Sequence, residues 1–284
     1  MSTILLIICI FSLSFQNVFK KQYNNKVQHG VFCFNAIASF FALLFFLIPV
    51  WIKGFQFDSK LIGYSVAYAI SYILALVGIQ LAILWGGFGM SSLIFSFSTV
   101  IPTVYALLFL NEKMTTVMGV GFVMLIISLI LTNSDYSVSG KVSMKWVVTI
   151  IVAFFGNGMC SVIQNVQQVN FNGGYKNEYM VLSLIVVEVL LWGIVLVKER
   201  PHIKESFSKG VFPAAACGIC NGATNILVMV LLGMMASSIL FPAISAGGII
   251  LSFAFAIFVY KEKLARKQSI GVVFGIIAIV LLNL

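Results

Sequence analysis

The sequence predicts an all-α integral membrane protein with ten transmembrane helices in two inverted five-helix repeats. Three observations lead to this prediction: an apolar composition, a series of long apolar segments and an internal repeat. Of the 284 residues, 61% are hydrophobic and 9% are charged, whereas a soluble domain contains about 25% charged residues. A chain of this composition cannot hide its apolar surface in water, so a soluble enzyme is disfavoured.

Apolar segments of about 20 residues, the length needed to cross a bilayer, follow one another along the whole chain. Polar or charged breaks separate them, such as the one at Asn172-Gly-Gly174. The first segment has no positive region before it and no small-residue cleavage site after it, so we expect a span and not a removable signal peptide. We predict ten spans, at 3–19, 30–52, 61–85, 90–110, 115–132, 146–168, 178–198, 210–232, 236–259 and 268–284.

Two short motifs occur twice along the chain at nearly one spacing. Asn111-Glu-Lys-Met114 matches Lys261-Glu-Lys-Leu264 at an offset of 150 residues, where the last span of each half begins. Gln16-Asn17-Val18 matches Gln164-Asn165-Val166 at an offset of 148 residues. The agreement of the two offsets indicates a duplication.

The number of spans in each copy sets the orientation of the second copy. A half with five spans begins on one side of the membrane and ends on the other, so its duplicate enters inverted, as in many secondary transporters. We therefore predict a first repeat at 1–133, a connecting loop at 134–145 and a second, inverted repeat at 146–284.

Over essentially its whole length the sequence resembles the ten-helix, two-repeat branch of the drug/metabolite transporter superfamily. The resemblance rests on the span count, the repeat length and a hydrophobic–Glu–Lys–x6–hydrophobic–Gly pattern at Glu112/Gly121 and Glu262/Gly271. It implies a secondary transporter of metabolites or drugs with a central cavity between the halves and both termini in the cytoplasm. The loops after spans 1, 5, 7 and 9 carry most of the 17 Lys and Arg residues, and this bias instead predicts both termini outside.

The net charge of +9 does not indicate nucleic acid, because the basic residues form short clusters between apolar segments. No phosphate loop, metal-ligand cluster or nucleophile triad is present, so we expect no enzyme, no metal and no cofactor. The expected partners are a small-molecule substrate and the lipid bilayer, with the proton as a candidate coupling ion. We expect a monomer or weak homodimer in a plasma (inner) membrane, which the lack of long soluble extensions favours.

Glu188 is the only acid in the middle of a predicted span. Burying its ionised form at mid-bilayer would cost about 3 kcal/mol or more, which points to a coupling carboxylate or a counter-ion for substrate. A protonated, hydrogen-bonded or snorkelling side chain without a role in transport is the alternative. Trp192, one turn further on, would suit an organic ammonium group, although Trp near a span end is commonly an interface anchor.

Further polar and aromatic residues recur on predicted spans at helical spacing. In lipid such a stripe must face inward, where it lines a cavity or joins helices, and we favour the cavity. The tyrosines can stack on a ligand, with core packing as the alternative. The candidate substrate-binding residues of this kind are Gln16 and Asn17 on span 1, Tyr64, Tyr68 and Tyr72 on span 3, Asn157, Gln164 and Asn165 on span 6, and Asn221 and Asn225 on span 8.

Pro102 and Pro242, in spans 4 and 9, are candidate hinges, with a static kink as the alternative. Together these residues favour a carrier of a cationic or zwitterionic metabolite or drug that works by alternating access. An anion carrier should show Arg or Lys inside its spans, and the predicted spans contain none away from their ends. An exporter of cationic drugs and a non-transporting receptor or assembly factor remain the alternatives.

Overall fold

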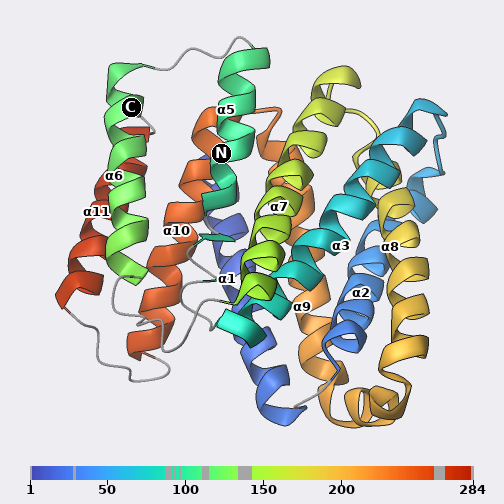
Figure 1. Ribbon diagram of the computed structural model, residues 1–284. Coiled ribbons are helices and arrows are strands. Elements are labelled where there is room, and N and C mark those ends of the chain that lie inside the picture. Colours follow the sequence, from blue (N-terminus) through green and yellow to red (C-terminus); the bar gives the residue numbers. More distant parts are fainter. Residues whose placement is uncertain are drawn as a thin grey trace.

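A computed structural model describes residues 2–27, 30–86, 91, 94–95, 97–110, 115–133, 143–258 and 266–282, and all regular structure in these ranges is helical. The all-α prediction is therefore confirmed for the described part of the chain. The helices lie side by side, mostly along one direction (Figure 1). They are α1 (Ser2–Lys26), α2 (Val31–Lys53), α3 (Lys60–Gly86), α5 (Val100–Phe109), α6 (Thr116–Asn133), α7 (Met144–Asn170), α8 (Lys176–Lys198), α9 (Ile203–Leu231), α10 (Ser237–Phe258) and α11 (Arg266–Leu282), with 3-10 turns η1 (Phe97–Thr99) and η2 (Arg200–His202).

Each predicted apolar segment overlaps one of these helices, but several boundaries were wrong. α1 continues to Lys26, where the sequence placed a loop after residue 19. α9 begins at Ile203 and not near residue 210. The segment predicted as a continuous helix over 90–110 contains the 3-10 turn η1 directly before α5. Hydropathy marks where a chain enters the apolar layer, whereas a helix continues past that point wherever its backbone hydrogen bonds are satisfied.

Within the described residues, six helices are long and apolar enough to cross a membrane: α1, α2, α3, α7, α8 and α9. Shorter apolar stretches lie in α5, α6, α10 and α11. Large apolar side chains cover the outside of the bundle, including Trp51, which is 89% exposed, and Val197, which is 83% exposed. A surface of this kind is stable only in contact with lipid, so the structure indicates a multi-pass membrane protein.

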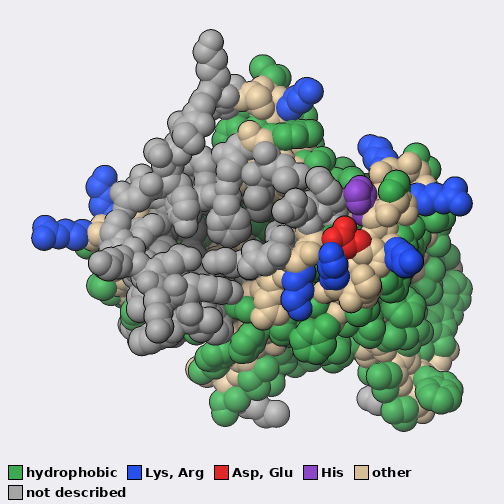
Figure 2. All heavy atoms as spheres, turned by 90° about the horizontal axis from the view of Figure 1, so that it is seen from below, with side chains coloured by type: hydrophobic (Ala, Val, Ile, Leu, Met, Phe, Trp, Pro, Cys, Tyr) green, Lys and Arg blue, Asp and Glu red, His purple; other side chains and the backbone are tan. Residues whose placement is uncertain are grey.

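Charged side chains gather at one end of the bundle. Viewed from the lower end of Figure 1, Lys and Arg side chains stand beside His and acidic side chains, and the flanks are hydrophobic (Figure 2). Lys198, Arg200, Lys204 and Lys209, in and next to the connection from α8 to α9, are all exposed. The chain termini lie toward the opposite end (Figure 1).

The two sequence halves interleave. Helix α3 packs on α7, α1 packs on α9, and α2 packs on both α8 and α9. Helix α6 of the first half packs on α11 of the second. The central packing of the bundle is therefore made between the halves, and the polar residues of both halves face a common interior.

Glycines allow the closest of these helix crossings. A Cβ atom built on Gly156 of α7 would lie 2.8 Å from the backbone N of Ala75 and 2.8 Å from the backbone O of Ser71, both on α3. A Cβ atom on Gly218 of α9 would lie closer still to the carbonyl oxygen of Ala38 on α2. Backbone atoms cannot rotate away as side chains can, so only glycine permits these contacts.

Hydrogen bonds join four helices at the Lys-rich end. The Tyr23 hydroxyl group, beyond the apolar part of α1, hydrogen-bonds the carbonyl oxygen of Gly30 at 3.0 Å and the hydroxyl group of Ser206 at 2.9 Å. Burial raises the pKa of Tyr23 to about 12, so the phenol stays protonated at neutral pH. The Glu199 carboxylate, at the end of α8, accepts hydrogen bonds from the backbone N–H groups of Phe32 and Cys33 at 3.2 and 2.8 Å.

Replacement of Glu199 by alanine is expected to lower the free energy of unfolding by about 1–2 kcal/mol, the usual cost of losing a helix N-cap. The first turn of α2 would lose the acceptor for two N–H groups. Thermal unfolding of the purified protein in detergent measures the change. Glu205→Ala is the matched control, because Glu205 forms an exposed pair with Lys209 at 3.1 Å, and such pairs contribute little. Equal losses in the two variants would contradict the capping role.

Candidate functional site

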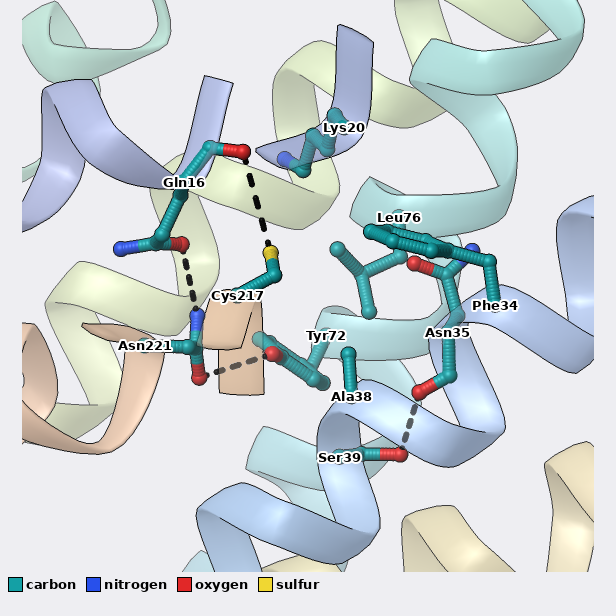
Figure 3. Close-up of a pocket in the computed structure, with 10 residues that line it drawn as sticks. All are labelled: Gln16, Lys20, Phe34, Asn35, Ala38, Ser39, Tyr72, Leu76, Cys217 and Asn221. Atoms are coloured by element: carbon teal, nitrogen blue, oxygen red, sulfur yellow. Dashed lines mark hydrogen bonds between the residues drawn. The ribbon is translucent and has the colours of Figure 1, made fainter. Parts of the chain in front are cut away.

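A polar network joins α1, α3 and α9 inside the bundle. Gln16 of α1 donates to the Thr224 hydroxyl oxygen at 2.9 Å and accepts from the Asn221 amide at 3.1 Å. The Tyr72 hydroxyl group of α3 donates to the Asn221 Oδ1 atom at 3.0 Å. Asn221 is thus the point at which helices of the two halves meet (Figure 3).

The network continues to α7 through Asn225, one turn after Asn221 on α9. Its amide nitrogen donates to the Asn221 Oδ1 atom at 3.0 Å. Its Oδ1 atom accepts from the Tyr68 hydroxyl group at 3.0 Å and from the Gln164 amide at 2.7 Å. The rings of Tyr68 and Tyr72 stack with centroids 5.6 Å apart. Six of the predicted site residues therefore form one continuous set of hydrogen bonds across four helices.

A small polar cavity lies beside this network, enclosed by α1, α2, α3 and α9 (Figure 3). Its volume of about 10 Å³ gives room for roughly one water molecule. An organic solute can enter only if the helices separate. The lining residues are Gln16, Lys20, Phe34, Asn35, Ala38, Ser39, Tyr72, Leu76, Cys217 and Asn221.

Glu188 of α8 lies directly behind the cavity wall. It is 8% exposed, and its Oε1 atom accepts a hydrogen bond from Ser39 at 2.6 Å. Its Oε2 atom is buried without a partner in the described part of the protein. Trp192 and Tyr72 also interact with this carboxyl group, and Trp192 stacks on Phe207 with ring centroids 6.2 Å apart. The predicted acid is thus buried next to the cavity.

The remaining predicted binding residues lie outside the network. Asn165 donates to Ser237 at 2.8 Å, at the start of α10. Asn157 donates to Ser98 of η1 at 2.6 Å. Tyr64 accepts from Asn170 at 2.6 Å. Each of these contacts joins two helices and none borders the cavity. The side chain of Asn17 lies outside the described residues.

The two candidate hinge prolines occupy different helix positions. Pro102 is the third residue of α5, in a first turn whose N–H groups need no intrahelical acceptor. The break in the helix comes just before it, at η1. Pro242 is buried inside α10 and removes a backbone donor from the helix interior.

Several cavity residues were missed from the sequence. Asn35 and Ser39 stand one turn apart on α2, and the Asn35 amide donates to Gln80 of α3 at 2.7 Å. Their four-residue spacing inside an apolar segment was a signal of an inward-facing stripe. Lys20 was assigned to a loop, but it belongs to α1 and lines the cavity. A basic side chain therefore lines the cavity, although the predicted spans contain none away from their ends.

The site contains amide, hydroxyl and phenol groups, together with the carboxyl group of Glu188 and the ammonium group of Lys20. Within the described residues, no group of three or more His, Cys, Asp or Glu side chains could hold a metal ion. Cys217 and Cys220 have free thiols. The arrangement can bind and orient a polar solute.

Comparison with known proteins shows the fold. No family model and no curated protein matches the chain. Among solved structures 28 chains match it. One of them, described as "Crystal structure of protein", has a TM-score of 0.77 and 11% sequence identity, and the match covers 99% of this chain and 95% of that chain. The architecture therefore extends over the whole chain and occurs in a solved structure.

Proposed function

We propose that this protein is a secondary transporter of the drug/metabolite transporter type, which carries a small zwitterionic or cationic organic solute across a plasma membrane by alternating access. The observation that carries the proposal is the polar network of Gln16, Tyr72, Asn221, Asn225 and Gln164 beside a cavity in an apolar bundle. Polar groups within a membrane are costly unless they are paired or in use, and they mark solute pathways.

The proposal includes ten crossings of the membrane. At 1.5 Å per residue, the 18, 22 and 17 residues of α6, α10 and α11 extend about 27, 33 and 26 Å, close to the roughly 30 Å of hydrocarbon. Helix α5 is shorter, with 10 residues, but it follows η1 and packs on both α7 and α10. We assign η1 and α5 to the remaining crossing.

The proposal also includes inverted repeats, and the helix packing supports them. A twofold axis that exchanges the halves pairs α1 with α7, α2 with α8, α3 with α9, α5 with α10 and α6 with α11. Under this exchange the contact of α1 with α9 becomes that of α7 with α3, and the contact of α2 with α9 becomes that of α8 with α3. The contact of α1 with α10 likewise becomes that of α7 with α5. All six of these contacts are present.

In the proposed cycle, the cavity opens to either side in turn. The Lys-rich end is held by Tyr23, Gly30 and Ser206. The other end is held by Tyr64 of α3, which hydrogen-bonds Asn170 at the end of α7. The ring of Tyr64 also meets that of Phe171, the residue after α7, edge to face with centroids 5.9 Å apart. Each closure joins one half to the other, so relative movement of the halves would release one end or the other.

Glu188 is the proposed coupling group, and Ser39 links it to the cavity. The Ser39 hydroxyl group has one proton but three acceptors: the Glu188 Oε1 atom at 2.6 Å, the carbonyl oxygen of Asn35 at 2.7 Å and the more distant carbonyl oxygen of Ala36 at 3.3 Å. When Glu188 is ionised, its carboxylate accepts a hydrogen bond from the Ser39 hydroxyl group. Protonated Glu188 instead donates to the Ser39 oxygen and frees the hydroxyl for Asn35. Loss of a proton from Glu188 would therefore turn the Ser39 hydroxyl group, which lines the cavity.

The first test is binding and exchange by the purified full-length protein. A panel of amino acids, amines and other small metabolites is expected to contain solutes that raise the melting temperature by several degrees through preferential binding to the folded state. The same solutes are expected to show counterflow in proteoliposomes. Binding without counterflow would favour a receptor or assembly factor, the alternative that the small cavity volume supports. Neither binding nor counterflow in a folded preparation would contradict the proposal.

A further inference from the structure

Lys20 is the charged residue among those that line the cavity. It lies on α1, one turn after Gln16, and its side chain is only half-buried. Among the described residues, none hydrogen-bonds or ion-pairs with its ammonium group, although Cys217 lies within its electrostatic reach. An ammonium group beside an apolar interior is stabilised by an acceptor of opposite charge. The cavity therefore presents a cation whose donors are available to a ligand.

The other polar groups around the cavity already have partners within the protein. Gln16, Tyr72 and Asn221 bond one another. Asn35 donates to Gln80 and to the backbone of Val31, and the single proton of Ser39 already has acceptors in Glu188 and in the backbone of α2. A solute that enters the cavity can accept a hydrogen bond from Lys20 without breaking a hydrogen bond within the protein.

Glu188 supplies the complementary group. Its Oε2 atom is a buried acceptor without a donor in the described part of the chain, and it lies behind Ser39 and Tyr72, which both line the cavity. The site thus combines a lysine without an acidic partner at the wall with an acid that has no basic partner among the described residues behind it. A ligand with a carboxylate and an ammonium group matches both, whereas a simple amine has no carboxylate for Lys20 and leaves that cation without an acceptor.

We propose that the solute is a zwitterionic amino acid and that Lys20 binds its carboxylate. This inference rests on the proposed transport function and narrows it, because it excludes simple cations as preferred substrates. Phe34, Ala38 and Leu76, the apolar residues of the lining, provide the surface for the side chain of the amino acid. The ammonium group of the solute is directed toward Glu188.

The test compares amino acids with their own decarboxylated amines. Each of the twenty common amino acids and the corresponding amine, for example leucine and isoamylamine, is assayed by thermal stabilisation, and the best binder is then used in counterflow. Amino acids are expected to bind at least tenfold more tightly than their amines. Lys20→Met is expected to remove that preference, and Lys20→Arg to retain most of it. Lys26→Met, at the exposed end of the same helix, is the matched control and is expected to keep the wild-type ratio.

The outcomes separate the inference from the function on which it rests. Counterflow of amines as fast as that of amino acids, or an unchanged amino acid to amine ratio in Lys20→Met, would overturn the inference and leave the transporter in place. Absence of exchange for every solute with the folded wild-type protein would overturn both. Because Lys20→Arg keeps the charge, its retained preference together with a loss in Lys20→Met would assign the effect to charge and not to folding.

Discussion

Replacement of Glu188 by glutamine is expected to reduce proton-driven accumulation of solute in proteoliposomes to less than a tenth of the wild-type level. Glutamine has nearly the same shape as a protonated glutamate, and its amide can donate to Ser39, but it cannot release a proton. The neighbours that interact with the carboxyl group in the described part, Ser39, Tyr72 and Trp192, are all neutral. None of them could take over the charge change, so counterflow without a proton gradient should persist at higher solute concentrations, with weaker binding because the counter-ion of the solute is lost, while its dependence on pH disappears.

Two further variants make this result specific. Ser39→Ala is expected to keep the pH dependence but to weaken binding, because Glu188 still titrates while its link to the cavity wall is lost. Glu178→Gln, which changes an acid in the first turn of the same helix, is the matched control and should behave as wild type. Undiminished proton-driven accumulation in Glu188→Gln would remove Glu188 from the coupling mechanism.

Replacement of Gly218 by alanine is expected to lower the free energy of unfolding by about 3 kcal/mol, the upper part of the usual range for overpacking. The added methyl group would collide with the carbonyl oxygen of Ala38 and with the side chain of Phe41. Helices α2 and α9 would have to separate, which would also disturb the cavity between them. The measurement is thermal unfolding in detergent, with the fraction of monodisperse protein as a second readout.

Gly193→Ala is the matched control for this variant. Gly193 lies inside α8, and a Cβ atom built there has no atom within 4 Å. Alanine is a better helix former than glycine by about 1 kcal/mol, so the control should be as stable as wild type or more stable. Equal melting temperatures for the two variants would show that the crossing of α2 and α9 is looser than the structure indicates.

Much of the helical architecture could be predicted from the sequence, because an apolar chain in lipid must satisfy its backbone within helices. Polar residues inside apolar segments could also be identified, and Gln16, Tyr72 and Asn221 indeed meet. Their partners were not predictable, because hydropathy gives no information on which helices are neighbours. The same amide type serves the network at Gln164 and an isolated helix contact at Asn157.

Lys20 shows most clearly where the sequence was insufficient. In the sequence it opens a polar, basic stretch that reads as a loop. In the structure α1 continues through this stretch, since Tyr23 and Val27 pack with α2 and α9 in a buried apolar cluster. Tertiary contacts thus extend a helix whose local composition favours a turn, and the extension brings a charge to the cavity.

The tyrosine–asparagine contacts between α3 and α9 have equal spacing on both helices. Tyr68 meets Asn225 and Tyr72 meets Asn221, each at 3.0 Å, and each pair of like residues is separated by one helical turn. If one helix slid along the other by a single turn, about 5.4 Å, one tyrosine would meet the other asparagine. One of the two phenol–amide hydrogen bonds could then re-form in the new register. Axial displacement of α3 along α9 would therefore cost less enthalpy than it would between helices without this equal spacing.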